Sequence, residues 1–233
     1  MNTNSSENQR PVLAKKQPIL VWDLGIRVFH WALVVLVIAL WVTAESEGDW
    51  MNVHRWLGTT VLALVLTRVI WGFVGSETAR FVTFLRSPRV VMAYLAGFFT
   101  RRPMPQTIGH NPAGGWSVLT LLILLLLQAG TGLFSNDDLF FEGPLSGWVG
   151  KEISDAMTGV HYLLFNCILA FIGLNIAAIV MHWLFKRENL LTPLIHGKTV
   201  VEAPARAPQP RSGLRALFIF LGVAIGLFLA LGR

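Results

Sequence analysis

The sequence predicts an all-α integral membrane protein with five transmembrane helices. Three observations support this fold class: 54% of the 233 residues are hydrophobic, only 14% are charged, and five long apolar runs divide the chain. In soluble domains about a quarter of the residues are charged, so the charged fraction of this chain is too low for that class. The net charge of +6 does not indicate nucleic-acid binding, because the basic residues flank apolar runs instead of lying on one polar element.

Polar segments separate the predicted helices. Residues 1–18 form a polar tail without the apolar stretch of a signal peptide. In the basic segment after the second span, residues 81–85 and 90–99 are too short to cross about 30 Å of hydrocarbon and predict interfacial helices. We expect residues 19–198 to form a four-helix domain, which residues 199–213 link to a C-terminal transmembrane helix. The five spans are predicted at about residues 28–43, 53–74, 116–134, 158–185 and 214–231.

The distribution of Lys and Arg predicts the orientation in the membrane. The amino-terminal tail, the loop between spans two and three, and the segment after span four are all rich in basic residues. The two opposite loops hold only Arg55 and Lys151 among many carboxylates. Since cytoplasmic loops carry the excess of Lys and Arg, the amino terminus should be cytoplasmic and the acidic loops should face the other side.

Four of the six histidines lie at ends of predicted spans, where ionisable residues are costly and indicate function. His54 and His161 lie just inside the outer boundary, and His30 and His182 just inside the inner one. One histidine at a span end is more often an interfacial residue than a ligand, but four that pair by depth favour ligation. Neutral imidazole is a strong axial ligand of haem iron, and two histidines on different helices can hold a haem in a bundle.

Two depths therefore predict two bis-histidine haem sites, between which an electron could cross the membrane. The haem would be b-type, because the lone Cys167 excludes covalent attachment through two cysteines and also a cysteine-only metal cluster. His110 and His196 lie in predicted cytoplasmic loops, and we do not expect them to be ligands.

Arg68 is the other ionisable residue inside a span. It lies 14 residues after His54, close to four helical turns, and therefore on the same helix face. Its guanidinium could pair with a propionate of the inner haem, or it could extend to the inner headgroups, and the sequence leaves both open. Small residues at Gly58, Gly130 and Gly132 could admit a flat macrocycle or allow close helix packing, and we favour packing.

Several short segments together resemble the bacterial cytochrome b561 family, which includes the b-type cytochrome subunit of nickel-iron hydrogenases. The resemblance covers roughly Ile19 to Lys198. It implies a four-helix core that holds two haems b with ligands from spans one, two and four, and with His54 and His161 on the outer haem. The segments are Phe29-His30-Trp31 after Asp23 and Arg27, the entry at His54, the run Gly109-His110-Asn111-Pro112-Ala113-Gly114-Gly115-Trp116, and the exit Arg187-Glu188-Asn189-Leu190.

The chain departs from the family pattern at Asn175. As we align it, the family usually has a second span-four histidine there, about 14 residues after the first. Because an amide is a poor iron ligand, either His182 replaces it and holds the inner haem with His30, or the inner haem has been lost. We favour ligation by His30 and His182.

The leading hypothesis is a membrane b-type cytochrome that transfers electrons through one or two haems b. By resemblance, it would lie in a bacterial inner membrane and connect membrane quinone, or an inner-face acceptor, with a periplasmic redox protein or a dehydrogenase- or hydrogenase-type subunit. It could form an oligomer. We predict no catalytic residues, because no nucleophile or general-base constellation is visible. The alternative, which Asn175 favours, is a non-redox membrane anchor or assembly subunit that has lost one or both haems. A transporter is disfavoured because the spans show no evident repeat or broken helix pair.

Overall fold

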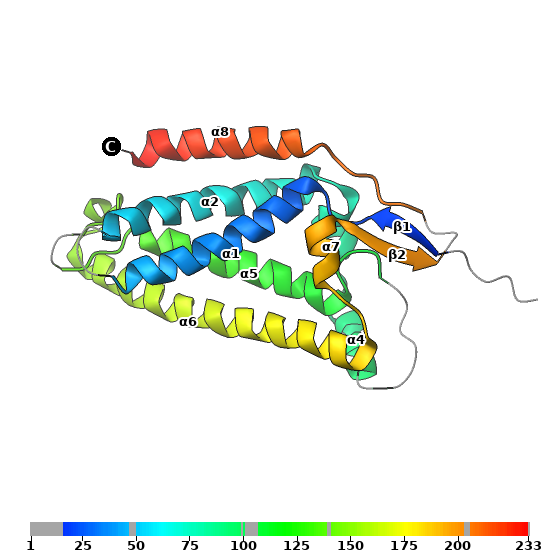
Figure 1. The fold of residues 1–233 in the computed structure, drawn as a ribbon. Helices are drawn as coiled ribbons and strands as arrows, with labels where there is room; N and C mark the ends of the chain where they lie inside the picture. Colours follow the sequence, from blue (N-terminus) through cyan, green and yellow to red (C-terminus); the bar gives the residue numbers. More distant parts are fainter. Residues whose placement is uncertain are drawn as a thin grey trace, which may run out of the picture.

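The computed structural model describes residues 16–46, 50–98, 100, 107–138, 141–202 and 206–232. Five helices in these residues are long and apolar enough to cross a membrane, which confirms the predicted all-α membrane fold. They are α1 (Leu24–Ala44), α2 (Trp50–Val74), α5 (Pro112–Gly132), α6 (Lys151–Met181, continued to Lys186 by a π-helical turn) and α8 (Gly213–Leu231). Figure 1 shows all five running side by side along one long axis.

Side-chain caps set where two of the spans begin. The Asp23 carboxylate accepts a hydrogen bond from the Ile26 N–H at 2.8 Å and starts α1. Asn111 accepts from the Gly114 N–H at 2.7 Å, and Pro112 occupies the first turn of α5, where its missing N–H costs nothing. The fourth span begins earlier than predicted, because α6 starts at Lys151 and projects beyond the apolar run.

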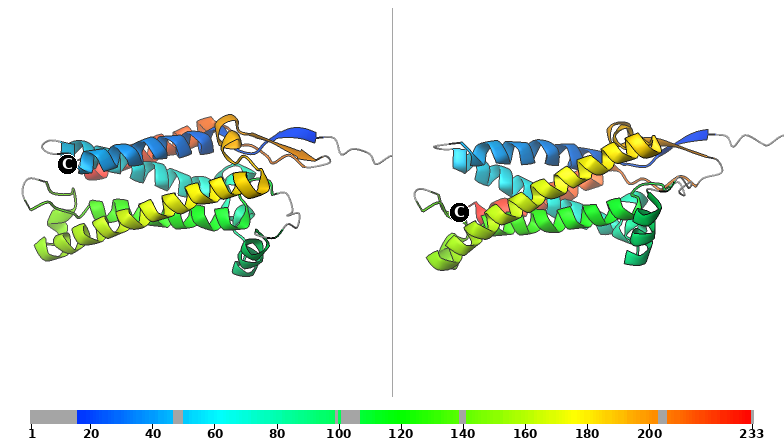
Figure 2. Two further views of the ribbon diagram at one scale, coloured as in Figure 1. Left: turned by 60° about the horizontal axis from the view of Figure 1, so that its bottom comes forward. Right: turned by 90° about the horizontal axis from the view of Figure 1, so that it is seen from below.

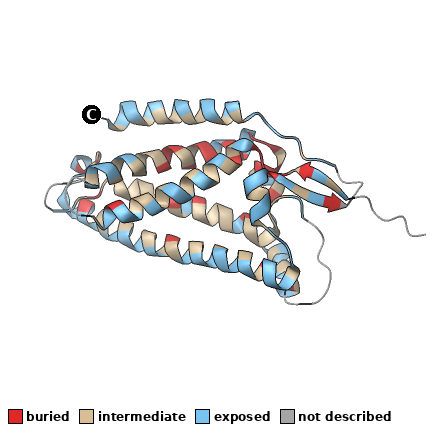
Figure 3. Cartoon of the chain, in the orientation of Figure 1, coloured by how far each residue is buried: buried red, intermediate tan, exposed pale blue. Residues whose placement is uncertain are grey.

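Helix α2 is central in the bundle. Eight of its residues are buried, whereas none of α8 is. Val61 and Val65 of α2 pack with Leu122 of α5 and Ile168 of α6. Figure 2 shows α1 and α8 lying along α2, with α5 and α6 forming the rest of the bundle. The outward helix faces in Figure 3 are mostly exposed, and they carry large apolar side chains suited to lipid.

Short elements cover one end of the bundle, which the sequence predicts to be cytoplasmic. The expected interfacial helices are present as α3 (Phe81–Phe84) and α4 (Pro88–Phe98), together with α7 (Leu191–His196). A three-residue 3-10 turn, Glu77–Ala79, also lies at this end, and a second one, Ser146–Trp148, lies in the loop at the opposite end.

A strand pair at the same end was not predicted. Strand β1 (Lys16–Leu20) pairs antiparallel with β2 (Lys198–Glu202). Each strand therefore crosses an expected boundary of the four-helix domain: β1 crosses the one between residues 18 and 19, and β2 the one between residues 198 and 199. Its buried residues Ile19 and Val201 pack with Ile26 and Trp71, against which Ala216 of α8 also packs.

Candidate haem site

The structure brings together the two histidines of the predicted outer pair. His54 of α2 and His161 of α6 face each other with ring centroids 6.3 Å apart. Two imidazoles that bind one iron from opposite sides hold their ring centres roughly 6 Å apart, since each metal–nitrogen bond is about 2 Å long and the ring centre lies about 1 Å beyond the nitrogen. The centroid separation of this pair therefore agrees with that of two imidazoles on one iron.

Backbone carbonyl oxygens hold both rings in the same way. The Nδ1 atom of His54 lies 3.1 Å from the Leu40 carbonyl oxygen of α1, and Nδ1 of His161 lies 2.9 Å from the Gln128 carbonyl oxygen of α5. A carbonyl can only accept, so Nδ1 carries the proton in each ring and Nε2 keeps its lone pair. Metal-binding histidines typically donate their other ring N–H in this manner.

A threonine hydroxyl reinforces each of these contacts. Thr43 Oγ1 lies 3.2 Å from Nδ1 of His54, and Thr131 Oγ1 lies 3.2 Å from Nδ1 of His161. Each hydroxyl donates to a carbonyl of its own helix, so its oxygen is oriented to accept from the imidazole. The two rings therefore have matching surroundings, although they stand on different helices.

Gly132 and Gln128 complete the surroundings of His161. A Cβ at Gly132 would lie 3.0 Å from Cε1 of His161, so the ring occupies space that only glycine leaves open. The Gln128 amide nitrogen lies 3.0 Å from Nε2 of His161, and the Gln128 Oε1 atom is buried without a hydrogen-bond partner among the described residues. The Gln128 amide nitrogen contacts the lone pair of His161 that iron would use, and the Gln128 side-chain oxygen has no partner among the described residues to hold the amide there. These residues fit a haem.

The structure does not bring His30 and His182 together in the same way. His182 is buried in the π-helical turn that ends α6; its Nδ1 lies 2.8 Å from the Ala178 carbonyl oxygen, and its Nε2 lies 2.8 Å from the Tyr94 hydroxyl. His30 instead contacts Trp31, and its Nδ1 has no hydrogen-bond partner within the described chain. No ring contact joins the two histidines over the described ranges, and the His182 ring instead contacts Tyr94 and Phe98 of α4.

Asn175 contributes to helix packing. Its side-chain oxygen accepts a hydrogen bond from the Ser117 hydroxyl at 2.9 Å, which ties α6 to α5.

Arg68 and His110 lie near each other at the same end of the bundle as β1 and β2. The Arg68 side chain is 4% exposed, and its guanidinium carbon lies 5.6 Å from the Phe81 ring. His110 contacts Trp22 and Phe84, with ring centroids 4.6 and 4.5 Å away. Burial and the nearby charge of Arg68 lower the pKa of His110 to about 3, so its imidazole is neutral. His196 is exposed on α7.

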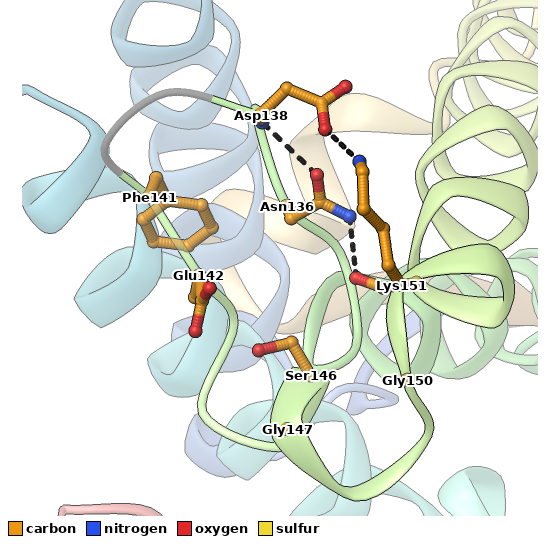
Figure 4. A pocket seen from close by; sticks show the side chains of 9 residues that line it. Asn136, Asp138, Phe141, Glu142, Ser146, Gly147, Gly150 and Lys151 are labelled. Carbon is orange, nitrogen blue, oxygen red and sulfur yellow. Dashed lines mark hydrogen bonds and ion pairs between the residues drawn. The ribbon is translucent and has the colours of Figure 1, made fainter.

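A polar pocket of about 530 Å³ lies at the opposite end, between the 136–150 loop and the start of α6. Figure 4 shows Lys151 meeting Asp138 beside Asn136. Ser154 also lines the pocket and precedes His161 by seven residues, which is two turns along the same helix face and about 10 Å. Its lining residues are Asn136, Asp138, Phe141, Glu142, Ser146, Gly147, Gly150, Lys151 and Ser154.

Several residues at these sites had not been singled out from the sequence. Thr43, Thr131, Gln128 and Tyr94 act through contacts with a ring on another helix. The positions of these residues along their own helices do not predict a contact with a histidine on another helix. Gly132 was noted from the sequence, but as a packing residue.

The family model for prokaryotic cytochrome b561 matches residues 21–197. A relative from Rhizobium leguminosarum bv. viciae, described as a probable Ni/Fe-hydrogenase B-type cytochrome subunit, is 25% identical over 79% of this chain and 90% of its own length. A protein of the same description from Bradyrhizobium diazoefficiens is 22% identical over 77% and 85%. A probable superoxide oxidase CybB from Yersinia pestis is 23% identical over 70% and 89%. No solved structure matches the chain significantly.

Proposed function

The chain belongs to the prokaryotic cytochrome b561 family, and we propose that it passes electrons between an outer-face redox partner and membrane quinone through a haem b held by His54 and His161. Family membership makes it a membrane b-type cytochrome of electron transfer. The observation that carries the finer proposal is the imidazole pair, in which both Nδ1 atoms are held by carbonyls, so that both Nε2 atoms keep the lone pair that iron would use; at His161 this Nε2 is contacted by the Gln128 amide, which iron would replace.

The haem supplies reversible one-electron chemistry at its iron. The protein supplies its position: α2 and α6 set the ring separation, while α1 and α5 fix the tautomer of each ring through Leu40 and Gln128. The Thr43 and Thr131 oxygens strengthen the donor character of both imidazoles, because a ring whose N–H is hydrogen-bonded is a more basic ligand.

For the inner end we propose that no second bis-histidine haem forms with the helices in this arrangement. A haem between His30 and His182 would require Nε2 of His182 to give up its contact with the Tyr94 hydroxyl and the two rings to come together. A haem-to-protein ratio of two would instead support the predicted pairing of His30 with His182.

We propose that the partner is a periplasmic redox protein or a hydrogenase- or dehydrogenase-type subunit, and that the chain lies in a bacterial inner membrane with its amino terminus in the cytoplasm. The predicted outer loops are acidic, with only Arg55 and Lys151 as basic residues. A negative face attracts a basic protein surface and repels a small anion such as superoxide. The polar pocket two turns from His161 lies at this face.

Absorption spectroscopy of the purified chain tests the haem assignment. Reduced-minus-oxidised spectra and a haem-to-protein ratio should give one haem b per chain. His54→Ala and His161→Ala should each lose it, whereas His196→Ala, a change at an exposed histidine on α7, should keep it. Full haem retention in both ligand variants would refute the pair. A folded wild-type chain without haem would favour the membrane anchor.

Quinone coupling needs a separate measurement. In proteoliposomes, a reduced quinone should reduce the haem of the wild-type protein, and added quinone should reoxidise it. A haem that binds normally but does not exchange electrons with quinone would leave the haem site intact and refute the quinone part of the proposal.

A further inference from the structure

The polar pocket of about 530 Å³ lies at the end of the bundle that the sequence predicts to face outward. Two carboxylates, Asp138 and Glu142, and one cation, Lys151, are among its lining residues, and we call it the outer pocket. Figure 4 shows Glu142 and Lys151 on opposite sides of it. Its volume lies within the range of ordinary ligand sites, so the outer pocket has room for a side chain of another protein.

Carboxylates outnumber cations around the outer pocket. Lys151 is the only basic residue between residues 136 and 155, and the same segment contains five carboxylates. The Lys151 ammonium pairs with the Asp138 carboxylate and lies 3.1 Å from Oδ1 of Asp155. Both ion pairs of the described residues belong to Lys151, so the Glu142 carboxylate has none. The pocket therefore offers a second carboxylate to a cation that comes from outside the chain.

The lining suits a cationic side chain. Phe141 lines the pocket next to Glu142, and a carboxylate and an aromatic ring can bind one ammonium or guanidinium group together. Within the described ranges, no three His, Cys, Asp or Glu residues are grouped as a metal site would need. The Lys151–Asp138 pair is on the surface, with the two side chains 69% and 65% exposed, so an incoming cation can displace Lys151 at little cost.

The wall of the outer pocket is joined to the surroundings of His161. The Asn136 side chain donates a hydrogen bond to Oγ of Ser154 at 2.6 Å, which holds the loop against α6. The neighbouring Ser135 hydroxyl donates to the Thr131 carbonyl oxygen at 3.0 Å, and Oγ1 of Thr131 lies 3.2 Å from Nδ1 of His161. Because Ser154 lies about 10 Å from His161 along α6, a protein bound at this pocket would lie close to the outer haem.

We propose that the outer pocket receives a lysine or arginine side chain of the outer-face redox partner. Glu142 and Asp138 bind the cation, and the Phe141 ring flanks it. The inference rests on the proposed function for the orientation of the chain and for the partner, and it adds where that partner docks. The partner should carry the basic side chain beside its own redox centre, because electron transfer requires that centre to lie near His161.

The test measures binding of a basic probe protein to the intact chain in nanodiscs of phosphatidylcholine, a lipid without net charge. The probe is cytochrome c, a soluble electron carrier with a lysine-rich surface. Surface plasmon resonance at low ionic strength gives the Kd without any electron transfer. The variants are Glu142→Gln and Lys151→Gln. Glu152→Gln is the matched control, because it removes the same charge from an exposed residue at the start of α6 that does not line the pocket.

Glu142→Gln should weaken binding about threefold to tenfold, as expected for the loss of one charge pair in an interface. Lys151→Gln should strengthen binding, because Asp138 then has no competing cation from its own chain. Glu152→Gln should change the Kd by less than about twofold. Equal weakening by Glu142→Gln and Glu152→Gln would overturn the proposal, because the acidic face as a whole would then explain binding. The absence of binding by the wild-type chain would overturn it as well.

The same assay on His54→Ala separates this inference from the proposed function. That variant should lose the outer haem, whereas the effect of Glu142→Gln on binding should persist, since neither haem ligand lines the pocket. A wild-type chain that contains no haem but binds the probe through Glu142 would refute the proposed electron transfer and support the docking site. A haem-loaded chain whose binding is insensitive to Glu142→Gln would refute the docking site and leave the haem assignment standing.

Discussion

Gly132→Ala should weaken haem binding at the outer pair. The added Cβ would lie 3.0 Å from Cε1 and 3.3 Å from Nδ1 of His161. Ordinary carbon contacts are about 3.5–4.0 Å, so the ring must move by roughly 0.5 Å. The ring cannot yield freely, because its Nδ1 is 2.9 Å from the Gln128 carbonyl oxygen.

We expect haem affinity to fall about tenfold to a hundredfold, the range seen when the support of a metal ligand is disturbed. The assay is an absorbance titration of the haem-free protein with haem. Gly130→Ala is the control, because it adds the same methyl group to the same helix, two residues away, with nothing within 4 Å. Equal affinities of the two variants would refute the steric argument at His161.

Two further changes test the inner end. The pKa of His110 is lowered to about 3 in the folded protein, whereas an unfolded histidine has a pKa of about 6.5. Between these two pH values the unfolded state binds a proton that the folded state does not. The stability should therefore fall as the pH is lowered from about 6.5 to about 3. His110→Asn should make acid unfolding, followed by circular dichroism, less steep across that window; an unchanged slope would contradict this environment. Gly197→Ala should lower the stability by roughly 1–2 kcal/mol, because φ is +80° and the new Cβ would lie 2.8 Å from the Trp22 carbonyl oxygen. An unchanged thermal midpoint would contradict that strain.

The outer pair was accessible from sequence because its depth depends on local features. Apolar runs placed the five spans along the chain, although α6 begins at Lys151 and not near residue 158, and the loop charges predicted which ends share a side. His54 and His161 were therefore predicted at the same depth. Two side chains at the same depth, on two helices of one small bundle, are expected to lie close together.

The contacts at the inner end were harder to predict, because they are made by the segments that connect the spans. The π-helical turn puts His182 against Tyr94 of α4. The sequence does not predict in which direction the short helix α4 runs relative to the bundle. Equal depth was therefore not enough to predict contact with His30.

The sequence by itself determined the class of the protein, its five spans and the pair of histidines at the outer depth, since hydropathy and helical rise are properties of each segment alone. Only the tertiary structure decided that β1 pairs with β2, that Arg68 is buried beside His110, and that carbonyls of α1 and α5 orient the outer rings. Those features depend on how helices tilt and rotate against one another. In a membrane every apolar face is compatible with lipid, so the apolar pattern of a single helix leaves its tilt and rotation open and packing decides them.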